Sequence, residues 1–200
     1  MTAKQPVPVV LSGRHVRLEP LSRDHLADLF AAGGGDEEVW RWMPTLAPRT
    51  AEELGAVLDA RLAEVERGSS VAFAVIRLAT GRAVGWTTYY DISTTDERLE
   101  IGWTWYGRSA WRTEVNTEAK WLLLVHAFEE LGMGRVSWRT DHLNERSQNA
   151  IRRLGARYEG TFRRHRRRPD GSWRDTVYFS LLAEEWPAAK QRLTDRMAAG

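Results

Sequence analysis

The 200-residue sequence contains no cysteine and no long apolar run. The absence of cysteine excludes disulfides, thiolate metal sites and a cysteine nucleophile, and it fits a reducing compartment. The first twenty residues lack the apolar core of a signal peptide, and no segment approaches the roughly 20 apolar residues that span a bilayer. We therefore expect a soluble, cytoplasmic protein.

The chain also lacks a strong excess of either charge. Twenty-nine Lys and Arg residues oppose twenty-seven Asp and Glu residues, which leaves a net charge of +2. The whole chain is therefore not a polyanion binder, and any recognition of an acidic partner must be local. A hydrophobic content of 42% with ten tryptophans is sufficient for one large core, so we expect a single domain spanning residues 1–200.

Apolar periodicity indicates helices in the first third of the chain. Residues 7 to 19 predict an extended entry, and an apolar stripe that ends at the glycines 33 to 35 predicts a helix. A second helix begins after Thr50, where Glu53 three residues later predicts a capping box.

From residue 70 the period changes to two, which predicts three consecutive antiparallel strands. A long helix over about 116 to 131 follows, then a short strand, a helix that ends at Gly155, a hairpin that turns at Pro169–Gly171, and a helix after Glu184. This order predicts an α/β fold of the mixed α+β type around one sheet.

The segment WRTEVNT, residues 111 to 117, runs directly into the long helix. A helix start after a strand presents free backbone N–H groups and the positive end of the helix dipole, and both favour an anion. Arg112 could add charge-assisted contacts. The alternative is an ordinary capped helix with Asn116 or Thr117 as its cap.

Two further positions carry candidate chemistry. Asn144 and Ser147 are three residues apart, so they share a helix face where the hydroxyl could donate a proton; alternatively Asn144 is only a cap. Glu100 is a candidate general base, or else a solvated strand residue. Alternation places two sets of residues on opposite faces of its strand: Glu100, Gly102 and Thr104 against Leu99, Ile101, Trp103 and Trp105.

The order of these features resembles the GNAT N-acetyltransferases, in particular the RimJ/RimL-like branch. The resemblance covers roughly residues 11 to 188 and rests on Glu100, WRTEVNTEAK and NERSQNAIRRLGA. It implies the GNAT fold, a central and mostly antiparallel sheet with flanking helices. It also implies acetyl-CoA as cosubstrate, with its pyrophosphate at the start of the long helix and its pantetheine arm along Trp103 to Trp105, where that strand splays from the next.

The sequence departs from the family pattern at two places. The pyrophosphate loop of the family reads Q/R-x-x-G/A-x-G/A, and here Trp111 and Glu114 replace a polar and a small residue. A Glu114 carboxylate turned toward the phosphates would weaken binding. The tyrosine that many GNAT enzymes use as a proton donor is replaced by Ile151, and the resemblance to the RimJ/RimL-like branch assigns that role to Ser147 in its NxxS turn.

The resemblance implies attack of a neutral amine on the acetyl thioester, with Glu100 as base, Glu159 as the second candidate for that role, and Ser147 as acid. We therefore expect Glu100 and Ser147 to be catalytic. The residues expected to bind the cosubstrate are Trp103, Thr104, Trp105, Arg112, Thr113, Glu114, Val115, Asn116, Thr117, Asn144 and Ser147.

Two segments bear on partners. Trp40, Trp42 and Met43 lie in the connection that borders the acceptor site in this family, and alternatively they cover the edge of the core. Residues 162 to 168 contain five arginines and one histidine, which could attract an acidic acceptor or RNA, or form the solvated face of a hairpin. The histidines show no metal-ligand spacing, so we expect no metal site.

These observations together predict an acyl-CoA-dependent N-acyltransferase that acetylates a primary amine, either a protein N-terminus or a small molecule. One alternative is a GNAT-fold binding or regulatory protein with a degenerate CoA site and an RNA or acidic partner. Another is a succinyl-CoA-dependent enzyme. We do not expect nucleic acid as the main partner, and the family habit suggests a homodimer.

Overall fold

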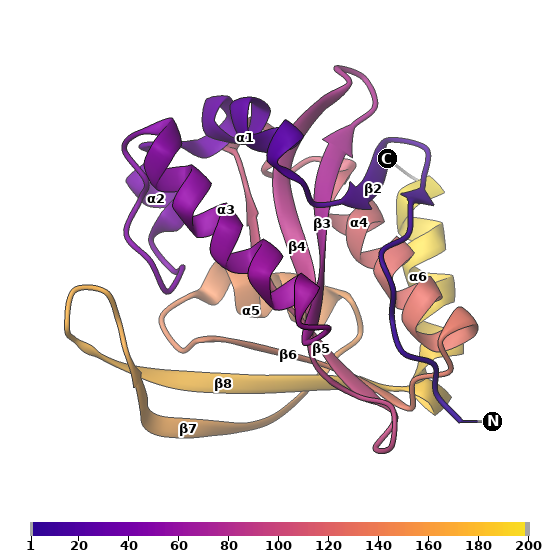
Figure 1. The fold of residues 1–200 in the computed structure, drawn as a ribbon. Coiled ribbons are helices and arrows are strands. Elements are labelled where there is room, and N and C mark those ends of the chain that lie inside the picture. Colours follow the sequence, from indigo (N-terminus) through magenta and orange to yellow (C-terminus); the bar gives the residue numbers. More distant parts are fainter. Residues whose placement is uncertain (1, 199–200) are drawn as a thin grey trace.

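The computed structural model describes residues 2–198, whose strands form one eight-stranded sheet with helices on both faces (Figure 1). The strands are β1 (Leu11–Ser12), β2 (Val16–Pro20), β3 (Ser70–Arg77), β4 (Arg82–Ser93), β5 (Arg98–Tyr106), β6 (Arg135–Asp141), β7 (Arg157–Arg167) and β8 (Trp173–Leu182). The α-helices are α1 (Leu26–Gly33), α2 (Glu37–Trp40), α3 (Ala51–Glu66), α4 (Glu114–Val125), α5 (Glu145–Arg153) and α6 (Trp186–Ala198). Short helical turns complete the structure: the 3-10 turns η1 (Arg23–His25), η2 (Arg108–Ala110) and η4 (Ala183–Glu185), and the π-helical turn η3 (His126–Glu130).

The strand order is β1-β2-β3-β4-β5-β6-β8-β7, and neighbouring strands are antiparallel except for β5 and β6. That parallel pair has only three register partners, from Arg98 opposite Arg135 to Glu100 opposite Ser137. Beyond Glu100 the two strands no longer pair. β5 and β6 are therefore splayed apart along Trp103 to Trp105, as the resemblance implied.

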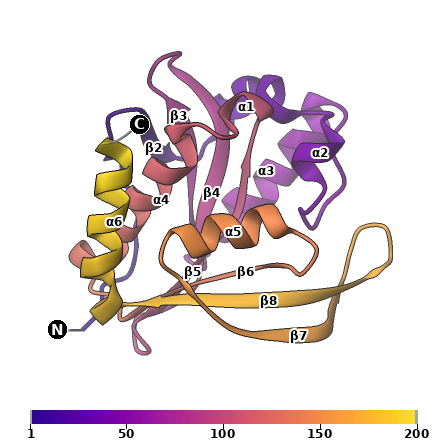
Figure 2. The same cartoon turned by 180° about the vertical axis from the view of Figure 1, so that it is seen from behind.

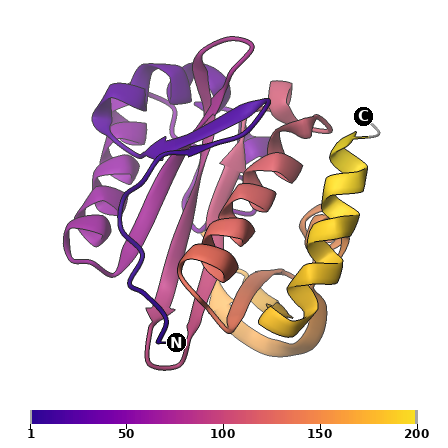
Figure 3. The same ribbon diagram turned by 90° about the vertical axis from the view of Figure 1, so that its right-hand side faces the viewer.

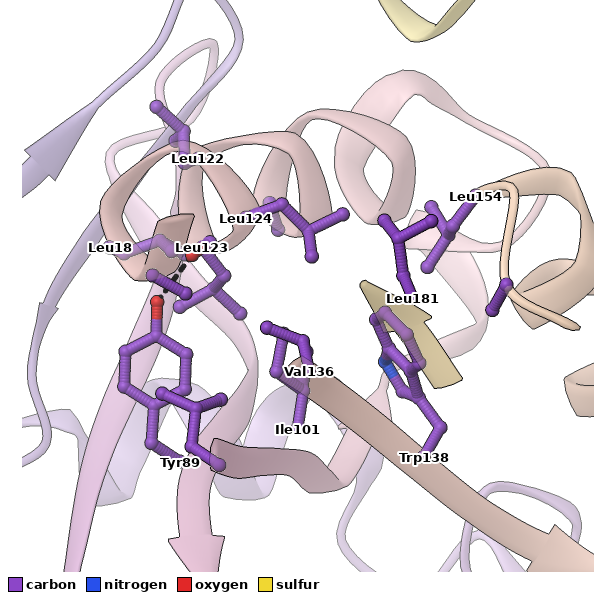
Figure 4. Packing of buried hydrophobic residues seen from close by; sticks show 14 of the residues in the cluster. Leu18, Tyr89, Ile101, Leu122, Leu123, Leu124, Val136, Trp138, Leu154 and Leu181 are labelled. Carbon is purple, nitrogen blue, oxygen red and sulfur yellow. Dashed lines mark hydrogen bonds between the residues drawn. The ribbon is translucent and has the colours of Figure 1, made fainter. Parts of the chain in front are cut away.

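The sheet separates two hydrophobic clusters, and helices cover each of its faces. Helices α1 to α3 cover one face, which we call the front face, around Trp40, Trp86 and Trp105. Helices α4, α5 and α6 cover the opposite, back face (Figures 2 and 3). There, Leu123 and Leu124 of α4 pack over the sheet, and the Tyr89 hydroxyl donates a hydrogen bond to the Leu123 carbonyl at 2.6 Å (Figure 4).

The sequence predicted this element order correctly, but several local details were wrong. The long helix begins at Glu114 with Thr113 as its cap, before the Asn116 or Thr117 considered from the sequence, and its last turn is the π-helical η3. Thr50 caps α3 as expected, accepting from the Glu53 amide at 3.2 Å. The Glu53 carboxylate, however, accepts the amide of Arg49 at 2.6 Å and so does not close the expected capping box on Thr50.

The expected alternation along β5 fails at a β-bulge. The register with β4 shifts between Gly102 and Trp105, and Trp103 has a φ of 48°. The extra residue turns Thr104 to the back face and leaves Trp103 on the front face with Trp105. Of the first predicted set, Glu100 and Gly102 share a face and Thr104 lies on the other. Of the second set, Leu99 and Ile101 remain on the back face, whereas Trp103 and Trp105 lie on the front.

Among residues 2–198, no helix combines the length and apolar character needed to cross a membrane.

Candidate active site

The start of α4 has the geometry of an anion site. Arg112 adopts a left-handed conformation with a φ of 60°, and Thr113 follows in an extended conformation as the helix cap. The Thr113 hydroxyl accepts the Val115 amide at 3.3 Å, while within the described chain the amides of Arg112 and Thr113 have no hydrogen-bond partner. Unpaired amides beside a left-handed residue at a helix start favour an anion.

The negative charge of Glu114, which departs from the family pattern, is partly neutralised. Its carboxylate lies 3.4 Å from the guanidinium of Arg77 on β3. Its pKa is lowered, first by its own backbone amide and then by the charge of Arg77. The carboxylate therefore occupies part of the positive helix start while Arg77 offsets its charge.

Trp111 connects this loop to the helix that carries the predicted acid. Its indole N–H donates to the Tyr106 carbonyl at 2.7 Å, and the guanidinium of Arg146 on α5 stacks 3.8 Å from its ring centroid. Asn144 caps α5 by accepting the Ser147 amide at 3.1 Å. The tertiary structure thus brings the helix start at 111–117 and the Asn144 to Ser147 turn together. Ile151 is a buried core residue of the back face.

The three residues expected along the pantetheine arm have different environments. Trp105 is buried between Trp40 and Trp86, and Trp103 carries the Arg61 guanidinium 3.9 Å from its ring centroid. Thr104 instead accepts a hydrogen bond from a lysine on the back face. The three side chains therefore do not form one site, and only the β5 backbone that they share lies along the splay.

Lys120 of α4 is that lysine, and the sequence gave no reason to select it. It is buried, and its Nζ donates to Thr87 at 2.9 Å and Thr104 at 2.8 Å. Burial lowers its pKa to about 7. A lysine on a helix is usually exposed to solvent, so only the tertiary structure shows that Lys120 is buried.

Glu100 lies on the front face at the point where β5 and β6 separate, with only 2% of its surface exposed. It accepts a hydrogen bond from the Tyr90 hydroxyl and forms an ion pair with the Arg139 Nε at 3.1 Å. Burial raises its pKa, and Arg139 and Tyr90 partly oppose this shift. A buried carboxylate with a raised pKa beside a strand splay fits a proton acceptor.

The two partners of Glu100 were missed by sequence reasoning. Tyr90 stands directly opposite Glu100 in the β4–β5 register, and Arg139 comes from β6. Gly102 is needed here, because a Cβ at this position would lie 2.6 Å from the Tyr90 ring. The aromatic run before the strand of Glu100 was the only available sequence signal.

Glu159, the second candidate base, occupies a different place. Both of its oxygens accept from the Arg135 guanidinium at 2.5 Å, and Ser180 donates to it at 2.7 Å. The Arg135 hydrogen bonds lower its pKa. Arg135 lies at the paired end of β5 and β6, so Glu159 is engaged away from the splay, and this arrangement favours Glu100 as the base.

The aromatic connection has two roles. Trp40 and Met43 belong to the buried core of the front face, as the alternative interpretation proposed. Trp42 is half-buried and lines a surface hollow of about 440 Å³ with Glu38 and Arg41 on one side and residues 143 to 146 on the other. The connection therefore borders the cap of α5.

Comparison with known proteins identifies a matching family. Residues 15–157 match the family model described as the acetyltransferase (GNAT) domain, which is more than half of the chain. A GCN5-related N-acetyltransferase structure from Brucella melitensis shares 34% identity, with a TM-score of 0.90 over 98% of this chain and 88% of that chain.

Two further relatives bear on the branch. YdaF of Bacillus subtilis (strain 168), provisionally named a ribosomal N-acetyltransferase, is 31% identical over 113 residues. This match covers 56% of the present chain and 61% of the relative, so it spans less than two thirds of the relative's length. Mycobacterium smegmatis RimJ, solved in complex with CoA-disulfide, matches in fold with a TM-score of 0.82 at 22% identity, over 94% of this chain and 95% of that one.

Proposed function

The chain belongs to the GNAT acetyltransferase family, and from this premise we propose that it transfers an acetyl group from acetyl-CoA to a primary amine. An acyl-CoA cosubstrate follows from the family, whereas the acetyl group and the acceptor are part of the proposal. The observation that carries it is Glu100, buried beside the splay of β5 and β6 and sharing one fold with an anion-binding helix start.

The residues at the start of α4 fit the pyrophosphate of an acyl-CoA. The free amides of Arg112 and Thr113 and the positive end of the α4 dipole supply donors to an anion. Val115, Asn116 and Thr117 extend this helix start. The Arg112 side chain is exposed and can add a charge-assisted contact.

A bound acyl-CoA supplies an activated thioester. The chain must supply the proton transfers, because an alkylamine is mostly protonated at neutral pH and must lose a proton before it attacks. Glu100 accepts this proton at its carboxylate, which Tyr90 and Arg139 hold in place. Backbone N–H groups of β5 beyond Glu100 polarise the carbonyl.

Ser147 protonates the departing thiolate. Its backbone amide is fixed by the Asn144 side chain, so the hydroxyl is presented from an ordered first turn of α5. The half-buried serine has no hydroxyl hydrogen bond within the described chain that would compete with this role.

We propose a protein N-terminus as the acceptor. The name of YdaF refers to ribosomal N-acetylation, and the surface hollow beside Trp42 opens toward the α5 cap. We assign the chain to the RimJ/RimL-like branch and expect it to act in the cytoplasm as a single domain.

The test is calorimetric titration with acetyl-CoA and succinyl-CoA, followed by CoA release in the presence of peptide N-termini and small amines. Micromolar acetyl-CoA binding with amine-dependent CoA release supports the proposal. Preference for succinyl-CoA would mean that succinyl-CoA, and not acetyl-CoA, is the acyl donor. Absence of binding to either acyl-CoA would contradict the proposal and favour a GNAT-fold binding protein.

A further inference from the structure

Arg174 of β8 is a half-buried cation that forms no ion pair within residues 2–198. Its Nε is buried and has no hydrogen-bond partner, and residues 2–198 offer its guanidinium no ion pair. Burying a charged group without a partner is costly. A bound anion could supply the charge-assisted pair that Arg174 lacks.

Arg174 points to the front face near Glu100. Along β8, Val177 and Phe179 belong to the back-face core, so alternation places Arg174 and Tyr178 on the front. Tyr178 lies 3.5 Å from an Arg139 Nη, and Arg139 in turn pairs with Glu100. Burial lowers the pKa of Arg174, and the charges of Asp141, Tyr90 and Arg139 also act on it. Arg174 therefore lies on the same surface as Tyr90 and Arg139, the two partners of Glu100.

This surface has more positive than negative charge. Arg166, opposite Arg174 in the hairpin register, likewise has no ion pair in the described part of the chain. The carboxylates nearby are already engaged: Glu100 pairs with Arg139, and Asp141 accepts two hydrogen bonds from Arg168 at 2.7 and 3.0 Å. Two guanidinium groups therefore remain available to an external anion.

Aromatic side chains surround the same place. The Phe162 ring lies 4.7 Å from that of Tyr178 and 5.3 Å from that of His165, and 55% of Phe162 is exposed. Burial lowers the pKa of His165, and the charges of Arg166, Arg139 and Arg174 lower it further. The lowered pKa disfavours the charged imidazolium, and the fixed positive charge of the surface comes from the arginines.

We propose that the acceptor amine carries a carboxylate, an inference that rests on the proposed function. Arg174 binds this carboxylate with support from Arg166, while the amine lies at Glu100. The carboxylate forms the charge-assisted pair that Arg174 lacks. Two sources fit this chemistry: an acidic side chain next to a protein N-terminus, and the α-carboxylate of a free amino acid.

The experiment compares matched acceptors that differ only in the carboxylate. CoA release from acetyl-CoA is measured for the full chain with Ser-Asp-Gly amide against Ser-Asn-Gly amide, and with serine against serine amide. We expect kcat/KM to be about 10-fold or more higher for the acidic member of one pair, because the carboxylate gains a charge-assisted hydrogen bond; a tenfold preference corresponds to about 1.4 kcal/mol. The pair that discriminates identifies the source.

Arg174→Gln then separates recognition from structure. The variant is expected to lose the preference through a higher KM for the acidic acceptor, with kcat and the KM of the neutral acceptor unchanged. The melting temperature of the free protein is expected to stay the same or rise, because a half-buried charge without an ion pair is removed. Arg153→Gln, at an exposed position on α5, removes the same charge and should retain the preference.

Turnover without any preference for the acidic acceptors, or a preference that survives Arg174→Gln, would overturn the inference and leave the proposed function intact. A variant that merely melts earlier and loses activity toward all acceptors alike would assign Arg174 a structural role and also overturn it. If no amine is acetylated, the proposed function fails. The carboxylate site is then tested by melting temperature, which Ser-Asp-Gly amide should raise in the wild type and leave unchanged in Arg174→Gln.

Discussion

Single residues decide the chemistry of the candidate site through partners that are distant in sequence. Glu100 is a plausible base because burial raises its pKa while Arg139 and Tyr90 hold it. Gly102 leaves the space that Tyr90 needs to reach it. Glu100 and Gly102 could be selected from the sequence as neighbours on one face, whereas the two partners that orient the carboxylate could not.

Glu100→Gln should lower kcat by roughly 100-fold or more, because general base catalysis contributes at least this much. The affinity for acetyl-CoA should not change, since Glu100 does not contact the start of α4. The pH profile of kcat/KM measures the role directly: the acid limb of the wild type should lie above the ordinary pKa of a glutamate, in the direction that burial shifts Glu100, and should disappear in the variant. If Glu159→Gln instead removes the acid limb, the base is Glu159.

Glu114→Gln should tighten acetyl-CoA binding by about 5-fold, because one like charge at about 4 Å from a phosphate costs ~1 kcal/mol in water. Arg77, which now faces the Glu114 carboxylate at 3.4 Å, would also be released toward the ligand. Calorimetric titration measures the dissociation constant. Glu52→Gln, in the exposed first turn of α3, is the matched control. Weaker binding in the Glu114 variant would mean that the carboxylate supports the loop.

At the scale of elements, α4 is held to the beginning of the chain by a buried carboxylate. Glu118 accepts the backbone amides of Arg14, His15 and Val16 at 2.7, 2.7 and 2.8 Å. These contacts fix the turn between β1 and β2 against the helix whose start is the candidate anion site. A contact between residues about one hundred positions apart leaves no local pattern, so sequence analysis did not identify it.

Glu118→Ala should lower the free energy of unfolding by about 3 kcal/mol, since the substitution leaves three backbone amides without their charged acceptor. Urea denaturation measures the change. Glu66→Ala, at an exposed position at the end of α3, should change stability by less than about 0.5 kcal/mol. A loss of similar size in both variants would mean that the Glu118 contacts contribute little.

At the scale of the whole molecule, the sheet separates two groups of charged side chains. The back face carries the buried Lys120 beneath α4, and the front face carries Glu100 and the arginines of β7 and β8. The Lys120 pKa of about 7 lies below the ordinary value of 10.5. Between these values the unfolded chain holds a proton that the folded chain has lost, so global stability should rise with pH across this window and be lowest below pH 7.

Lys120→Met should remove this rise and stabilise the protein at pH 6, because it eliminates the cost of a buried charge while Thr87 and Thr104 still bond one another at 2.8 Å. Urea denaturation at pH 6, 8 and 9.5 measures the effect. Lys4→Met, at an exposed position, should retain the pH dependence of the wild type. A Lys120→Met variant that is less stable at every pH would show that the ammonium hydrogen bonds outweigh the cost of burial.

The sequence by itself determined the order of helices and strands and the Asn144 cap of α5, and it made the segment before α4 a candidate anion site, because periodicity, capping and turn chemistry act over a few residues. Only the tertiary structure decided which face each side chain occupies after the bulge at Trp103. It also decided that Glu100 meets Tyr90 and Arg139, that Lys120 is buried, and that Arg174 has no counter-ion in the described chain. These properties depend on contacts between segments far apart in the chain, and the balance of burial and charge at such contacts exists only once the sheet has formed.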